Sequence, residues 1–130
     1  MTEPALPAEV LALIRGPLAT IAHVETLLLL RRTAPQSMPV AVVQADAHIA
    51  TPAAARRCLD ELVAAGLVEM AVRDEYRYAP ARADLREAAE ALARMYNEKP
   101  VTLVRAIYAR PAGPVQAFAD AFRLLRKEAP

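Results

Sequence analysis

The chain has 130 residues, of which 55% are hydrophobic and 24% are charged, and its formal net charge is +1. This length fits one domain, or one domain with an appendage, and the composition provides a core and argues against disorder. A net charge near zero gives no overall electrostatic signal for nucleic acid or for a membrane surface.

The single cysteine, Cys58, leaves no second thiol for a disulfide within the chain, which suits the reducing cytoplasm. Residues 1–9 do not combine a cationic segment with an apolar stretch, so we expect no secretory signal. The most hydrophobic run, residues 27–30, is far shorter than the roughly 20 apolar residues that cross a bilayer. We therefore expect a cytoplasmic protein with no membrane partner.

Three helices are predicted at the start of the chain. The first covers Pro7 to Ile14, and the second covers Ala19 to Arg32, where apolar residues recur on one face. A loop over residues 33–38 precedes the third helix. We expect that helix from Pro39 to Ala47, because proline is favoured at the first helical position.

A fourth helix and a β-hairpin follow. Thr51 and Pro52 form a strong helix start, a hydroxyl cap followed by proline, and Gly66 is expected to end this helix in a left-handed conformation. The pattern then changes to that of strands over residues 67–72 and 76–78, which predicts the hairpin.

Three further helical segments are predicted after the hairpin. Apolar residues recur at helical spacing from Leu85 to Tyr96, and a last helix follows the proline-rich break at residues 111–114. The segment between them is expected to place four apolar side chains on one side: Val101, Val104, Ile107 and Tyr108. The predicted fold class is therefore mainly α with a small β-hairpin.

The order of helix, loop, short helix, tight turn, capped helix, glycine and hairpin over residues 19–80 resembles a winged helix-turn-helix. Within residues 51–68 the sequence TPAAARRCLDELVAAGLV follows the pattern x-x-L-x-x-L-x-x-x-G-L-[VI]. It is similar to the recognition helix and first wing strand of bacterial MarR and PadR transcription regulators. The resemblance implies that Leu59 and Leu62 anchor this helix on the core. The alternative is an unrelated helical domain with one hairpin.

The exposed face of the recognition helix of such regulators enters the major groove of double-stranded DNA. The DNA-binding residues that the resemblance implies here are Thr51, Ala53, Arg56, Arg57, Arg73 and Arg77. Among them Arg57 suits the reading of a base edge, whereas Arg56 and Arg73 suit contacts with phosphates and Arg77 supports the wing.

Several charges argue against DNA binding. Asp60 and Glu61 lie on the same helix face and repel phosphates, and their spacing predicts ion pairs with Arg56 and Arg57, respectively. The wing tip, residues 73–75, has mixed charge. A near-neutral recognition face leaves a second class open, a non-catalytic protein-protein interaction module that has lost DNA binding.

Other basic residues lie outside the recognition helix and the wing. They either contact phosphates or are solvated charges at helix ends, as the helix dipole favours. These residues are Arg31, Arg32, Arg123, Arg126 and Lys127.

The resemblance divides the chain into a winged-helix domain with an N-terminal helix, residues 1–80, and a C-terminal helical extension, residues 81–130. Phe118, Phe122 and Leu125 have helical spacing in this extension, which resembles the dimerisation arms of bacterial regulators. We expect a homodimer, since symmetric dimers are the commonest oligomers, with packing on the chain's own domain as the alternative.

Motifs for catalysis, metals and cofactors are missing from the sequence. His23 and His48 are far apart and do not form a zinc ligand set, and three glycines at 16, 66 and 113 do not form a phosphate-binding loop. Cys58 lies on the apolar face of the fourth helix, which predicts a buried structural thiol. We therefore expect no enzyme, no cofactor and no metal.

Overall fold

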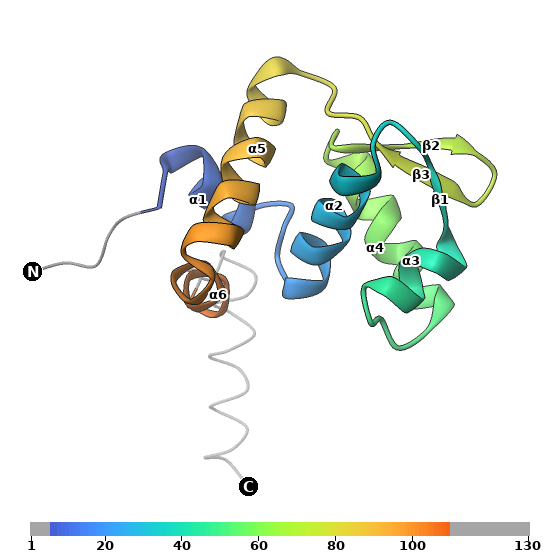
Figure 1. Ribbon diagram of the computed structural model, residues 1–130, viewed down its shortest axis with the longest axis horizontal. Coiled ribbons are helices and arrows are strands. Elements are labelled where there is room, and N and C mark those ends of the chain that lie inside the picture. The colour runs from blue at the N-terminus through green and yellow to red at the C-terminus, as the bar shows by residue number, and fades with distance from the viewer. Residues whose placement is uncertain (1–5, 110–130) are drawn as a thin grey trace, which may run out of the picture.

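The computed structural model describes residues 6–109, which form six helices and a small three-stranded antiparallel sheet (Figure 1). The helices are α1 (Ala8–Arg15), α2 (Ile21–Thr33), α3 (Val40–Asp46), α4 (Pro52–Ala64), α5 (Ala83–Glu98) and α6 (Pro100–Tyr108). The strands are β1 (Met38–Pro39), β2 (Val68–Val72) and β3 (Glu75–Tyr78). The predicted mainly α character is confirmed. None of these helices is both long enough and apolar enough to cross a membrane.

Helices α2 and α4 begin at threonine caps. Thr20 precedes α2, and its hydroxyl oxygen accepts a hydrogen bond from the backbone N–H of His23 at 3.2 Å. Thr51 precedes α4 and accepts from the N–H of Ala54 at 3.0 Å, with Pro52 as the first helical residue, as predicted. Each hydroxyl thereby satisfies an N–H group that has no acceptor within its helix.

Strand β1 corrects two predictions, the loop over residues 33–38 and the helix that begins at Pro39. Pro39 lies in β1, which pairs with β3 and gives the strand order β1-β3-β2. Helix α3 starts one residue later, and the N–H of Val40 donates to the carbonyl oxygen of Asp74 in the β2–β3 turn at 3.0 Å. A strand of two residues has no periodic pattern, so its distant pairing partner alone identifies it.

Gly66 joins α4 to β2 with a φ of +82°, the left-handed conformation that the sequence predicts. Its N–H donates to the carbonyl oxygen of Val63 at 3.0 Å, and the N–H of Leu67 donates to that of Leu62 at 3.1 Å. These two bonds form a Schellman motif, which satisfies carbonyl groups at the end of the helix. Leu67 is fully buried as a result, and the chain can turn directly into the sheet.

The core is centred on α2, which lies between α5 and α3 in Figure 1. Val24, Leu27 and Leu30 of α2 are fully buried, and this helix contacts α3, α4 and β3. Leu59 and Leu62 of α4 are also fully buried, which confirms that they anchor this helix. Helix α1 packs against α5 and α6. The burial of one side of α4 leaves its other side to solvent.

Helix α6 is rotated relative to the prediction. Leu103 and Ile107 are its buried side chains, whereas Val101 is 65% exposed and Tyr108 is 78% exposed. Of the four residues expected on one apolar side, Val101, Val104, Ile107 and Tyr108, only Ile107 is buried, so that side is not the one that packs on the core. Both stripes have helical spacing, so periodicity alone does not decide which of them packs against α1 and α5.

Candidate functional site

The outer face of α4 is the surface for which the sequence predicts DNA contacts. Ala53, Arg56 and Arg57 are exposed on this helix, and Thr51 is exposed at its start. The Thr51 hydroxyl oxygen caps α4, so this side chain has a structural role. Arg57 makes no ion pair with any residue in 6–109, so its guanidinium group is available to a partner.

Arg56 pairs with the hairpin and not with its own helix. Its Nη1 atom lies 2.5 Å from Oδ1 of Asp74 in the β2–β3 turn, and this contact lowers the pKa of the Asp74 carboxyl group. The predicted pair of Arg56 with Asp60 is wrong. Asp60 instead accepts a hydrogen bond from the Tyr76 hydroxyl of β3 at 2.7 Å. The hairpin lies beside α4 and supplies a partner for both side chains.

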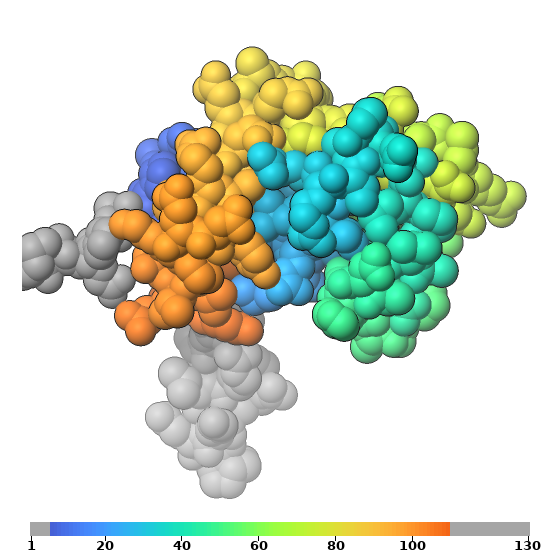
Figure 2. Space-filling view, in the orientation of Figure 1, coloured from blue at the N-terminus to red at the C-terminus, as the bar shows by residue number. Residues whose placement is uncertain are grey.

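Of the two hairpin arginines, one forms an ion pair within the described part of the chain and the other does not, as on α4. Arg77 is bound by Glu69, its cross-strand neighbour in the β2–β3 register. Arg73 is exposed in the turn and makes no ion pair among residues 6–109. In Figure 2 this hairpin projects beyond the helices. Of the four arginines predicted to contact DNA, Arg56 and Arg77 are thus neutralised within the chain, while Arg57 and Arg73 are not.

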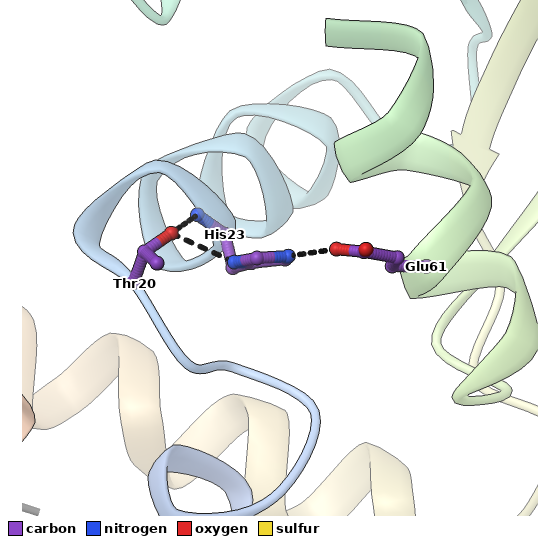
Figure 3. Close-up of polar contacts among 3 residues, drawn as sticks. All are labelled: Thr20, His23 and Glu61. Atoms are coloured by element: carbon purple, nitrogen blue, oxygen red, sulfur yellow. Dashed lines mark hydrogen bonds and ion pairs between the residues drawn. The ribbon is translucent and has the colours of Figure 1, made fainter. Parts of the chain in front are cut away.

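Glu61, the predicted partner of Arg57, contacts α2 (Figure 3). Its Oε1 atom lies 2.6 Å from Nε2 of His23, and Nδ1 of the same imidazole lies 2.7 Å from Oγ1 of Thr20. The predicted Arg57–Glu61 pair is therefore wrong. If the Thr20 hydroxyl donates to Nδ1, the Nε2–H group donates to Glu61, and one imidazole joins the start of α2 to α4. The Thr-x-x-His spacing, in which histidine takes the glutamate position of a capping box, is a sequence signal for the contact between Thr20 and His23 but not for Glu61.

A cavity of about 300 Å³ lies beside this chain of hydrogen bonds and is lined in part by His23, Arg57, Cys58 and Glu61. Burial raises the pKa of the Cys58 thiol, which keeps it protonated and a poor nucleophile, in line with the structural role predicted for it. Hydroxyl, imidazole and carboxylate in this order occur in hydrolases. Here the Thr20 oxygen also caps α2, so the arrangement fixes one helix against another.

A second polar cluster, which the sequence did not indicate, joins α2, β3 and α5. Arg31 donates to both carboxylate oxygens of Glu90, at 2.9 Å from Nε and 2.5 Å from Nη2, and the Tyr78 hydroxyl donates to Glu90 at 3.0 Å. The Arg86 guanidinium lies 5.9 Å from the centre of the Tyr78 ring. The Arg31 guanidinium group is therefore occupied by Glu90 and is not free to contact phosphates.

Within residues 6–109, no three histidine, cysteine, aspartate or glutamate side chains are placed to hold a metal ion. Six residues of the predicted arm and of the predicted basic set lie outside this range: Phe118, Phe122, Leu125, Arg123, Arg126 and Lys127.

The chain was compared with known protein families, with curated proteins and with solved structures, and it matched none of them.

Proposed function

We propose that the chain is a winged helix-turn-helix protein that binds double-stranded DNA through α4 and the β2–β3 hairpin and acts as a dimer. The observation that carries the proposal is the exposed face of α4 beside a projecting hairpin, with one unpaired arginine on each, Arg57 and Arg73. A helix is the element that fits the major groove, and a guanidinium group binds guanine or phosphate. Arg57 then reads a base and Arg73 contacts the backbone.

Duplex binding is expected to be weak and to depend on these two arginines. Arg57→Ala should weaken binding to the best duplex by about tenfold and relax base preference at one position. Arg73→Ala should weaken all duplexes similarly and reduce the slope of log affinity against log salt by about 1. Arg94→Ala, on the exposed side of α5, is the matched control and should change neither. Mobility shifts with a random duplex library at low salt provide the measurement, and no shift of any duplex would end the proposal.

The alternative function is a protein-protein interaction module without DNA binding. The charge on this face favours it, because Arg56 and Arg77 are bound by carboxylates and Asp60 and Glu61 lie on the same helix. Three apolar side chains are also exposed on α4 and β2: Val63 at 37%, Met70 at 48% and Val72 at 59%. Apolar area with little net charge is typical of protein interfaces. A protein partner that protects α4 and β2 from hydrogen exchange, with no duplex bound, would favour this alternative.

The dimer is expected to depend on the C-terminal extension. Phe118→Ala with Phe122→Ala should shift the protein toward monomer, because exposing each large apolar side chain costs about 1.5–3 kcal/mol. The exposed Val101 and Tyr108 of α6 supply further apolar surface just before this segment. Sedimentation of wild type and double variant at micromolar concentration measures the effect, with circular dichroism to check that helicity is kept. A wild-type monomer, or a double variant that unfolds, would place the two phenylalanines in the chain's own core.

A further inference from the structure

A separate cavity of about 220 Å³ lies where α2, the α3–α4 turn and α5 meet. Its polar lining comes from all three elements: Glu25 and Arg32 on α2, Asp46 and His48 at the end of α3 and in the turn, and Tyr96 on α5. Leu28 and Leu29 of α2 add an apolar part. In Figures 1 and 2, α5 and α3 flank α2 on the face turned toward the viewer.

The opposite charges around this cavity do not pair with each other. The ion pairs within residues 6–109 lie elsewhere, and Glu25, Arg32 and Asp46 take part in none of them. Glu25 accepts one hydrogen bond, from the Tyr96 hydroxyl at 3.2 Å. The pKa of Tyr96 is raised, first by burial and then by Glu25, while Arg32 lowers it, so both charges lie close to the phenol. Arg32 and Asp46 are exposed to solvent and Glu25 is half-buried, so a small solute can reach all three charges.

His48 is held in the left-handed backbone conformation, with a φ of +58°. It follows the end of α3, where glycine adopts this conformation without steric cost. A histidine there has a backbone cost that glycine avoids, and its side chain lines the cavity. The imidazole adds to the cavity lining a group that can donate or accept a hydrogen bond.

We propose that this cavity binds a small zwitterion, a molecule with one ammonium and one carboxylate group. The ammonium group binds at Glu25 and Asp46, and the carboxylate binds at Arg32. Two carboxylates against one guanidinium group disfavour an anion. A simple cation satisfies the carboxylates but leaves the guanidinium group without a partner, whereas a zwitterion satisfies both signs of charge. The volume lies below the roughly 300 Å³ at which drug-sized pockets begin, so the ligand is small. This site does not depend on DNA binding.

Titration of the full chain with glycine, L-alanine and L-serine, followed by amide chemical shifts, tests the proposal. At least one of the three is expected to cause saturable shifts at residues 25–32, 46–48 and 96. The L-alanine analogues N-acetyl-L-alanine and L-alaninamide, which lack the ammonium and the carboxylate charge respectively, should bind about tenfold more weakly or less than L-alanine. Shifts that do not saturate, shifts elsewhere in the protein, or equal binding of the singly charged analogues would overturn it.

Variants test the two charges separately. Arg32→Gln and Glu25→Gln should each weaken binding of the zwitterion by about tenfold, since each removes one charge-assisted contact. Arg94→Gln, an exposed α5 arginine that does not line the cavity, should bind as the wild type does. Thermal melts identify any variant that does not fold. Asp46→Asn then replaces Glu25→Gln, and Arg32→Met replaces Arg32→Gln. The site is refuted if folded variants that lose the positive charge and folded variants that lose a negative charge all bind with wild-type affinity. Because the measurement uses no DNA, its outcome is distinguishable from that of the duplex experiment.

Discussion

Gly66→Val is expected to destabilise the protein by about 2 kcal/mol, because a β-branched residue resists the left-handed conformation that the α4–β2 junction requires. The added Cβ atom would also lie 3.2 Å from Cδ1 of Leu85 and 3.7 Å from Cβ of Ala81. The Leu85 contact involves the end of a flexible side chain, so the backbone conformation contributes the larger part. For a chain of this size each kcal/mol lowers Tm by about 4 °C, which gives a fall of about 8 °C.

Gly66→Asn separates these two contributions. Asparagine adds the same Cβ atom but tolerates positive φ far better than valine does, so it should cost clearly less. Thermal and urea unfolding of the three proteins provide the comparison. If the asparagine variant were as unstable as the valine variant, the contact with Leu85 would dominate. A wild-type Tm in Gly66→Val would contradict the Schellman motif at this junction.

The residues that shape this junction form bonds close by in the sequence. Thr51, Pro52 and Gly66 act through bonds to residues at most four or five positions away, so their roles can be read from spacing alone. The same is true of Leu59 and Leu62, whose positions on one helix face predict their burial. Element types were therefore predictable over residues 51–66 without knowledge of the rest of the fold.

The candidate site was harder to predict because its contacts join distant parts of the chain. The i,i+4 rule paired Arg56 with Asp60, but pairs of this kind contribute only about 0.3–0.5 kcal/mol on a helix, so a better placed partner displaces them. Asp74 is such a partner for Arg56 once the hairpin folds beside α4. His23 and Glu61 are 38 positions apart, and no sequence spacing relates them.

Arg31 illustrates the same limit, since its position in the last turn of α2 suggested a favourable interaction with the helix dipole. In the folded chain its partner is Glu90, which lies 59 positions away on α5. Periodicity indicates which face of a helix is buried, but it does not indicate which polar side chain from another element meets a charge at the edge of that face. The contact between α2 and α5 therefore makes Glu90 a stability test of the fold.

Glu90→Gln is expected to destabilise the protein by about 1–2 kcal/mol at neutral pH. It removes the carboxylate charge that binds Arg31 and that strengthens the hydrogen bond from the Tyr78 hydroxyl. Breaking a fully buried pair costs more, about 3–5 kcal/mol, but here the side chains of Arg31 and Glu90 are 34% and 36% exposed and water screens them. Asp84→Asn is the matched control. Its partner Arg82 lies at 3.0 Å, but both side chains are about two-thirds exposed or more, at 66% and 71%, so almost no change is expected.

The pH dependence of the Glu90→Gln effect gives the sharper test. Arg31 holds the pKa of Glu90 below its ordinary value of 4.5, so the ionised carboxylate stabilises the fold above that pH, and this contribution is lost as the pH falls through the lowered pKa. The stability difference between wild type and Glu90→Gln should therefore shrink in acid. Urea unfolding near neutral pH and in acid measures it. A difference that is unchanged or larger in acid would mean that Glu90 acts through packing and not through charge.

Alkaline titration tests the third member of the cluster. Burial, followed by the hydrogen bond to Glu90, raises the pKa of Tyr78 from 10.0 to about 12. The neutral phenol thus stabilises the fold fully below pH 10, and this contribution is lost as the pH rises from 10 toward 12. Ultraviolet absorbance should show a phenol that ionises late in the wild type, is missing in Tyr78→Phe, and ionises earlier in Glu90→Gln. Because burial is the larger cause, Glu90→Gln should return the pKa of Tyr78 only part of the way to 10, and an unshifted titration would show that the phenol does not depend on Glu90.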